Sequence, residues 1–136
     1  MQQVVLFMMS TKEIALGWLD KAKRFLTAAK RSLDESLYDM ACFNSQQAAD
    51  MALKAVLIMK SGYKPLTHSI TELLEAISEI EEVPSDISDC SGIEEHYIQA
   101  RYPNARVKEY SFDEAQDSVK CGEAIVRFAE GILEEG

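Results

Sequence analysis

The chain has 136 residues, of which 47% are hydrophobic, so it is long enough for one domain with a packed core and short for two. Acidic side chains outnumber basic ones by 23 to 14, giving a net charge of -9. This balance excludes a general coat for DNA or other nucleic acids, because binding many phosphates requires an excess of Lys and Arg. The charge is uneven, since residues 1–61 carry eight basic and six acidic side chains whereas residues 62–136 carry six and seventeen. A local basic patch remains compatible with this composition.

The three cysteines are odd in number and widely spaced. Cys42, Cys90 and Cys121 form no CxxC pair. This spacing fits neither a disulfide framework nor a zinc knuckle. A reducing, cytoplasmic setting is therefore the expected one.

Residues 1–11 are predicted to form an apolar N-terminal tail, followed by a single helical domain over 12–136. The segment MQQVVLFMM lacks a basic leader and is too short to span a bilayer or to act as an ordinary signal peptide. Met8 or Met9 could also be the natural start. No later segment reaches about 18 apolar residues, so we expect a soluble protein with no membrane role.

The first helix is expected to begin at Ser10. Ser10 and Glu13 have the spacing of a capping box, in which each side chain bonds the other residue's backbone N–H. Apolar residues then recur every three or four positions to about Ser36. The opposite face is basic, with Lys21, Lys23, Arg24, Lys30 and Arg31. This face is either solvated or a contact for phosphate or an acidic partner.

The second helix, Tyr38 to Lys60, is predicted to be the centre of a bundle. It contains no Pro or Gly and is rich in strong helix formers. It has two apolar rows, one of them mostly Ala, so neighbours should pack on two sides and approach closely on the Ala side. Gln46, Gln47 and Asp50 are its polar exceptions, and any of them that is buried should bond across the bundle or a dimer.

Three more helices are expected after Ser61-Gly62 and Pro65 end the central one. Thr67 or Ser69 should cap the third helix. The fourth should span Asp86 to about Ala100, and Ser111 with Glu114 should open the last. The inward residues expected in the fourth helix are Ile87, Ile93, Tyr97 and Ile98. The fold class is therefore all-α, an up-and-down bundle of about five helices with a core like that of a four-helix bundle.

Signals for metal binding or a protein nucleophile are weak. His68 and His96 are the only histidines and belong to no HExxH or ExxH pair, so no metal or other cofactor is expected. Cys42 is interpreted as a small core residue and His68 as a capping or packing residue. No catalytic residue is assigned.

The stretch YIQARYPNARVKEY is the most informative candidate site. Arginines bind phosphate through forked hydrogen bonds, and a neighbouring aromatic ring can stack on a base. The predicted residues for binding a nucleotide or partner are Tyr97, Arg101, Tyr102, Arg106 and Lys108. The alternative is structural, with an Arg tying the loop to a helix.

Three pieces together resemble the HEPN domain family (higher eukaryotes and prokaryotes nucleotide-binding). They are YDMACFNSQQAADMALKAVLIMKSG, THSITELL and YIQARYPNA, which precede a final amphipathic helix. The resemblance covers about residues 12 to 134. It implies a bundle of four to five helices, commonly a homodimer, often encoded beside a minimal nucleotidyltransferase as a toxin–antitoxin-like pair.

Many members of that superfamily are metal-independent ribonucleases that use an Arg followed, after four to six residues, by a His. That motif is absent here, because no His follows Arg101 or Arg106 after four to six residues, and no Arg lies at that distance before His68 or His96. The leading hypothesis is therefore a dimeric, non-catalytic module that binds a nucleotide or RNA and pairs with a nucleotidyltransferase. The alternatives are a ribonuclease using Arg101 and Arg106 with Lys108 or Tyr102 in place of His, and a purely structural interaction bundle.

Overall fold

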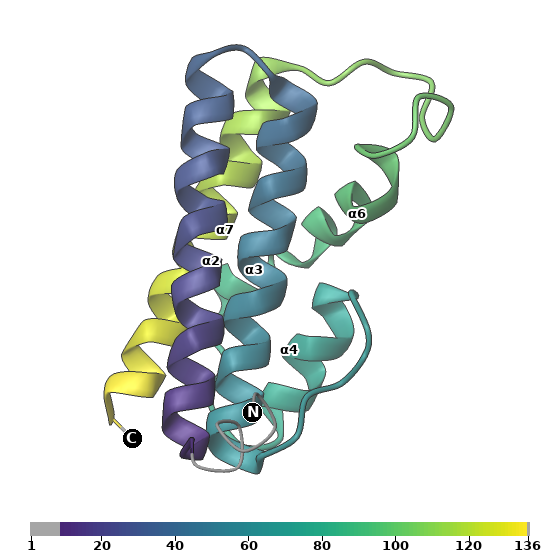
Figure 1. The fold of residues 1–136 in the computed structure, drawn as a ribbon. Coiled ribbons are helices and arrows are strands. Elements are labelled where there is room, and N and C mark those ends of the chain that lie inside the picture. Colours follow the sequence, from purple (N-terminus) through teal and green to yellow (C-terminus); the bar gives the residue numbers. More distant parts are fainter. Residues whose placement is uncertain (1–8, 136) are drawn as a thin grey trace.

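The computed structural model describes residues 9–135, and three long helices dominate it (Figure 1). They are α2 (Thr11–Asp34), α3 (Tyr38–Ser61) and α7 (Phe112–Glu135). Helix α3 packs against both α2 and α7, while α4 (Ile70–Ser78) and α6 (His96–Gln99) lie against another side of α3. The prediction of an all-α bundle is confirmed, and residues 9–135 contain no strand. Of the predicted N-terminal tail, residues 1–8 lie outside the described part.

Both ends of the α2–α3 hairpin follow the local signals. Ser10 Oγ accepts a hydrogen bond from the Glu13 N–H (3.0 Å), and the Glu13 carboxylate accepts one from the Ser10 N–H (3.4 Å), so the capping box is present. A three-residue connection, residues 35–37, turns the chain, with Ser36 at φ 64. Helix α3 ends at Gly62, whose φ of 70 lies in the left-handed region that glycine enters without steric cost.

Helix α3 is buried on more than one side, as its two apolar rows predict. Its alanines at positions 41, 48, 49, 52 and 55 are all fully buried. Gly122 of α7 faces the backbone of Ser45, where an added Cβ would lie only 3.3 Å from the Ser45 carbonyl oxygen. Small side chains on both helices therefore allow α3 and α7 to approach closely.

The prediction of one continuous fourth helix is wrong. The segment contains α5 (Ser85–Ser88), the 3-10 turn η1 (Ser91–Glu95) and α6. Ile87 and Ile93 are both buried, although six residues of α-helix would place them about 120° apart around the axis. The interruption at Asp89 and Cys90, between α5 and η1, lets both face the core, and Ile98, predicted to be inward, is 58% exposed.

A carboxylate from the next segment completes the start of α4. Ser69 caps this helix by accepting from the Glu72 N–H (3.1 Å), while its own N–H donates to Thr67 Oγ1 (3.0 Å). Glu94 accepts from the Thr71 N–H (2.8 Å) and from the Ser69 hydroxyl (3.1 Å). Burial opposes ionisation of Glu94, but these hydrogen bonds outweigh it and lower the pKa of its carboxyl. Glu94 thus fastens η1 to α4.

None of the helices within residues 9–135 combines the length and the apolar character needed to cross a bilayer.

Candidate functional site

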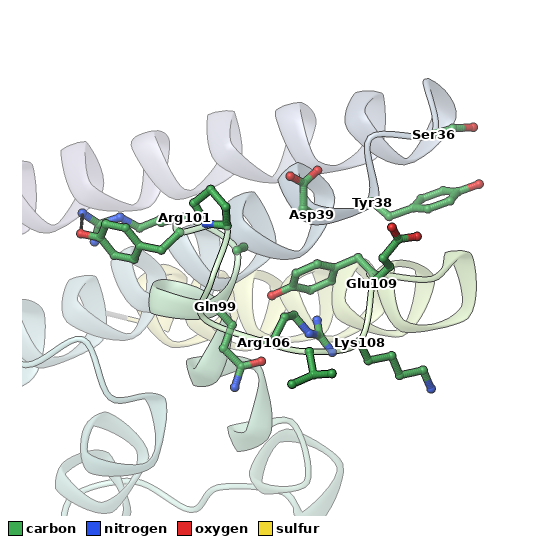
Figure 2. A pocket seen from close by; sticks show the side chains of 13 residues that line it. Ser36, Tyr38, Asp39, Gln99, Arg101, Arg106, Lys108 and Glu109 are labelled. Atoms are coloured by element: carbon green, nitrogen blue, oxygen red, sulfur yellow. Dashed lines mark hydrogen bonds between the residues drawn. The ribbon is translucent and has the colours of Figure 1, made fainter.

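A hollow of about 670 Å³ lies between the loop that follows α6 and the α2–α3 turn. We call it the basic hollow. Figure 2 shows Arg101 at one end, with Ser36 and Asp39 contributed by the helical hairpin. Its loop side is formed by Gln99, Ala100, Arg101, Tyr102, Pro103, Arg106, Val107, Lys108, Glu109 and Tyr110. Four of the five predicted site residues therefore line one concave surface.

Arg101 is an exposed cation of the basic hollow. Its guanidinium lies over the rings of Tyr97 (4.7 Å) and Tyr102 (5.2 Å) and donates to the Tyr102 hydroxyl (3.2 Å). It forms no ion pair with any residue of the described chain. An Arg held on aromatic faces keeps its charge and some of its donors available to an anion. Tyr97 does not line the hollow and lies behind Arg101.

Arg106 ties the loop to a helix, which was the structural alternative to phosphate binding for an Arg in this loop. Its guanidinium pairs with Glu114 of α7 (3.1 Å) and lies 3.8 Å from the centre of the Tyr110 ring. Its side chain is only 18% exposed. Arg106 therefore ties the loop to the start of α7 more than it offers a free charge. Lys108, by contrast, extends away from Arg101 into solvent (Figure 2).

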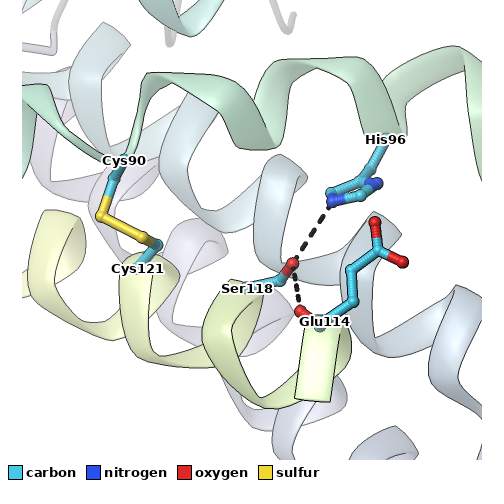
Figure 3. Close-up of a disulfide and its surroundings, with 5 residues drawn as sticks. All are labelled: Cys90, His96, Glu114, Ser118 and Cys121. Atoms are coloured by element: carbon cyan, nitrogen blue, oxygen red, sulfur yellow. Dashed lines mark hydrogen bonds between the residues drawn. A yellow bond between two sulfur atoms is a disulfide. The ribbon is translucent and has the colours of Figure 1, made fainter. Parts of the chain in front are cut away.

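His96 is the centre of a buried polar chain beneath the loop (Figure 3). It is 3% exposed, with Nδ1 2.9 Å from the Tyr110 hydroxyl and Nε2 3.3 Å from Ser118 Oγ. The Ser118 hydroxyl donates to the Glu114 carbonyl (2.9 Å), so its single proton is used. His96 then donates from Nε2, and in the neutral ring, which burial favours, Nδ1 accepts from the Tyr110 hydroxyl. Sequence patterns missed this chain because its members are far apart along the sequence.

Stability should fall when the solution is acidified through the ordinary titration range of His96. Burial lowers the pKa of the His96 imidazole from its ordinary value of 6.5, although the nearby carboxylates of Glu114 and Glu95 oppose the shift. The unfolded chain then binds a proton that the folded chain does not, so folding stability is complete above pH 6.5 and decreases below it. Thermal unfolding at about pH 7.5 and about pH 5.5 measures the drop. His96→Gln should show a smaller drop, and an equal drop would contradict this assignment.

The pairing of the cysteines differs from the prediction made from their spacing in the sequence. Cys90 and Cys121 form a disulfide that joins the turn between α5 and η1 to α7 (Figure 3). The expectation of no disulfide is therefore wrong, because tertiary packing brings together two cysteines that are 31 positions apart. Cys42 is buried, as predicted, and burial raises the pKa of its thiol to about 11. Cys42 therefore stays protonated and unreactive.

Glu95, His96 and Glu114 are the group in residues 9–135 whose ligand atoms come closest to a metal site. One such atom from each lies within 4.8 Å of the others. Both nitrogens of His96 already have hydrogen-bond partners, and Glu114 is paired with Arg106. The group is therefore arranged as a hydrogen-bonded network, and a cation there would have to displace it.

A second polar cluster lies under the start of α4. Asp50 is 1% exposed, and its carboxylate lies 2.6 Å from Lys54 Nζ and 2.8 Å from His68 Nδ1. Gln46, also buried, donates to the His68 carbonyl (3.3 Å). The His68 ring stacks on Tyr97, with centroids 4.2 Å apart. The expectation that buried Gln46 and Asp50 bond across the bundle is confirmed, while Gln47 is half-buried.

The basic face of α2 is partly used for packing. Lys23 pairs with Glu130, and Lys30 with Glu123 (3.2 Å), so two of its five cations fasten α2 to α7. Arg24 and Arg31 line a second, smaller hollow of about 400 Å³. This face remains a weaker candidate than the basic hollow, because only α2 and the residue after it build it.

Comparisons with known proteins agree on one family. The sequence model of the HEPN domain matches residues 15–132. A curated relative named "Putative toxin MJ1304", from Methanocaldococcus jannaschii, is 25% identical over 133 residues, covering 87% of each chain.

Three solved structures are similar in fold. TT1696 from Thermus thermophilus has a TM-score of 0.81 and 33% identity, over 87% of this chain and 97% of that chain. The HEPN domain protein tm0613 from Thermotoga maritima has a TM-score of 0.71 and 33% identity, over 87% and 98%. ST0689, an archaeal HEPN homologue, has a TM-score of 0.71 and 27% identity, over 88% and 97%. With a family match over most of its length and a fold shared with HEPN structures, the chain belongs to the HEPN domain family.

Proposed function

We propose that this HEPN protein is a binding module for the phosphates of a nucleotide or single-stranded RNA, and that it is one member of a toxin–antitoxin-like pair. The observation that carries the proposal is the charge of the basic hollow. The chain has a net charge of -9, yet the hollow is lined by three basic residues, Arg101, Arg106 and Lys108, and by two acidic ones, Asp39 and Glu109. A concave surface with local positive charge attracts polyanions to an otherwise repulsive protein.

Each residue at the hollow has a different role in the proposed binding. Arg101 supplies a forked donor for a phosphate, and Lys108 supplies a mobile point charge. Tyr102, 52% exposed beside Arg101, offers a ring on which a base can stack. Arg106 holds the loop in place through Glu114. Tyr97 supports Arg101 from behind.

A protein partner is supported by the relative named as a toxin and by exposed apolar side chains near the hollow. Ile98, Val107 and Phe112 are all exposed in the segment that forms or flanks the loop. Surface apolar groups gathered near a charged site are typical of an interaction surface. We propose a homodimer and a minimal nucleotidyltransferase as the two partners, in agreement with the resemblance of the sequence motifs.

Binding of labelled single-stranded RNA, followed by fluorescence anisotropy at several salt concentrations, tests the proposal. Arg101→Ala should weaken binding about tenfold and reduce the salt slope by about 0.7, because one phosphate contact is lost. Lys108→Ala should have a smaller effect. Lys120→Ala, which removes an exposed cation outside the hollow, is the matched control and should leave affinity unchanged.

Two outcomes would contradict the proposal. In the first, the wild-type protein binds neither RNA nor ATP and does not co-purify with a nucleotidyltransferase encoded beside it. The second is equal affinity for wild type and Arg101→Ala. Light scattering on the same samples determines whether the protein is a dimer.

A further inference from the structure

Asp39 places a carboxylate in the basic hollow. It lines the hollow from the first turn of α3, and Figure 2 shows it between Arg101 and Glu109 along that surface. Within residues 9–135 Asp39 forms no ion pair. A carboxylate repels phosphate, so a hollow that bound only phosphate would bind it more tightly without this residue. Phosphate binding therefore does not account for Asp39.

The start of α3 accounts for Asp39 only in part. An acidic residue in the first turn stabilises a helix, and Asp39 Oδ1 accepts a hydrogen bond from the Met40 N–H (2.9 Å). No group in the described part of the chain donates to Oδ2, and Asp39 is exposed. Each oxygen of a carboxylate accepts more than one hydrogen bond, so both can still accept from a ligand. The bond to Met40 thus orients the carboxylate and leaves it able to bind.

Glu109, the second carboxylate of the hollow, is held less firmly. It belongs to the loop between α6 and α7, and its side chain forms neither a hydrogen bond nor an ion pair with another residue of the described chain. Asp39 instead projects from a helix of 24 residues. A contact that selects one ligand over another requires an acceptor or donor in a fixed position. Of the two carboxylates, Asp39 meets that requirement.

The two acceptors of the Asp39 carboxylate match the edge of one base. Guanine carries two neighbouring donors on its Watson–Crick edge, N1–H and the N2 amino group, which the two oxygens of a carboxylate accept together. Adenine and uracil each place an acceptor beside a single donor, so a carboxylate is repelled there. Cytosine offers its N4 amino group beside an acceptor, N3. Guanine is therefore the base that this carboxylate binds best.

We propose that Asp39 makes the basic hollow selective for guanine, in a guanine nucleotide or in an unpaired guanine of single-stranded RNA. This inference rests on the proposed function, because Arg101 of the same hollow binds the phosphate. The hollow has a volume of about 670 Å³. Ligand pockets typically measure roughly 300–1,000 Å³, so a base and its phosphate can lie in it together.

Fluorescence anisotropy with short labelled U-rich RNAs that carry a single G, A or C tests the selectivity. The RNA with G should bind about fivefold more tightly than the all-U RNA, which is the lower limit for a bidentate base contact, because Asp39 is exposed to solvent. GMP should compete better than IMP, which lacks the N2 amino group, and better than AMP. Strong competition by GMP indicates a nucleotide ligand, whereas binding only of the RNAs indicates a longer strand.

Two variants separate base selection from charge. Asp39→Asn keeps an acceptor for the Met40 N–H and replaces the other oxygen with an amino group. It should bind the G-containing and all-U RNAs equally, and the all-U RNA more tightly than wild type does, because a negative charge is removed. Glu109→Gln, the matched control, removes the same charge from the same hollow. It should strengthen binding of every RNA and preserve the preference for G.

Two results would overturn the assignment. One is equal affinity of the wild-type protein for all of these RNAs, and the other is a preference for G that persists in folded Asp39→Asn. Either would leave the proposed binding function intact, provided that Arg101→Ala still weakens binding. Failure of the wild-type protein to bind any of the RNAs or GMP would remove the selectivity and the proposed function together.

Discussion

Replacing Asp50 with Ala should lower the free energy of unfolding by about 3–5 kcal/mol, because the variant leaves a buried ammonium without its carboxylate. Lys54 and Asp50 are one helical turn apart on α3, and both side chains are nearly inaccessible, at 4% and 2% exposed. Desolvation makes each of these charges costly alone, whereas their 2.6 Å contact offsets that cost when both are present. Urea unfolding of wild type and variant gives the difference directly.

A double variant distinguishes the cost of leaving one charge unpaired from the cost of changing the side chains at these two positions. Asp50→Leu with Lys54→Met removes both charges, so it should be far more stable than either single variant and close to wild type. The surface pair of Arg127 with Glu123 has the same spacing, but its Arg side chain is 75% exposed. Arg127→Ala should therefore cost less than about 1 kcal/mol. Strictly additive effects of the two buried substitutions would contradict the account.

Local signals in the sequence were sufficient to locate most helix ends. Ser10 with Glu13, Ser69 with Glu72 and Gly62 each act on backbone groups within a few residues, so their effect can be predicted without tertiary information. The prediction of one continuous fourth helix was wrong because local signals do not determine its interruption. Burial of Ile87 and Ile93 on one side required a break that only packing against the rest of the bundle determines.

The cations of the candidate site could be predicted from the sequence, but the residues with which they form hydrogen bonds could not. Arg101, Tyr102, Arg106 and Lys108 adjoin one another in sequence, and the structure places them around one hollow. That Arg106 pairs with Glu114, however, depends on how the loop meets α7. The disulfide and the His96 chain likewise join segments that are far apart along the chain.

The spacing of polar residues in the sequence indicates the buried cluster under α4, but the prediction of polar exceptions in this helix included only part of the cluster. Gln46, Asp50 and Lys54 follow one another at intervals of four, which places three polar groups on one stripe of an otherwise apolar helix. Gln46 and Asp50 stand out as polar exceptions, whereas Lys54 falls within a row of bulky side chains. A carboxylate and an ammonium one turn apart on a helix buried on several sides indicate a buried ion pair.

Substituting Gly122 with Leu should destabilise the bundle by about 1–3 kcal/mol, because α7 cannot move away from α3. Even a methyl group at this position would lie 3.3 Å from the Ser45 carbonyl oxygen and 3.4 Å from its Cα and Cβ. These are mostly backbone atoms of a helix that packs against both α2 and α7, so they cannot yield as a flexible side chain would.

Gly131 provides the matched control for this substitution on the same helix. It is exposed, and an added Cβ there meets no atom within 4 Å. Gly131→Ala should therefore stabilise the protein by about 0.5–1 kcal/mol, because alanine loses less backbone entropy in a helix. The two variants should move the urea midpoint in opposite directions. If Gly122→Leu were as stable as wild type, the close α3–α7 contact would not limit the size of the side chain, and small residues along α3 would need another explanation.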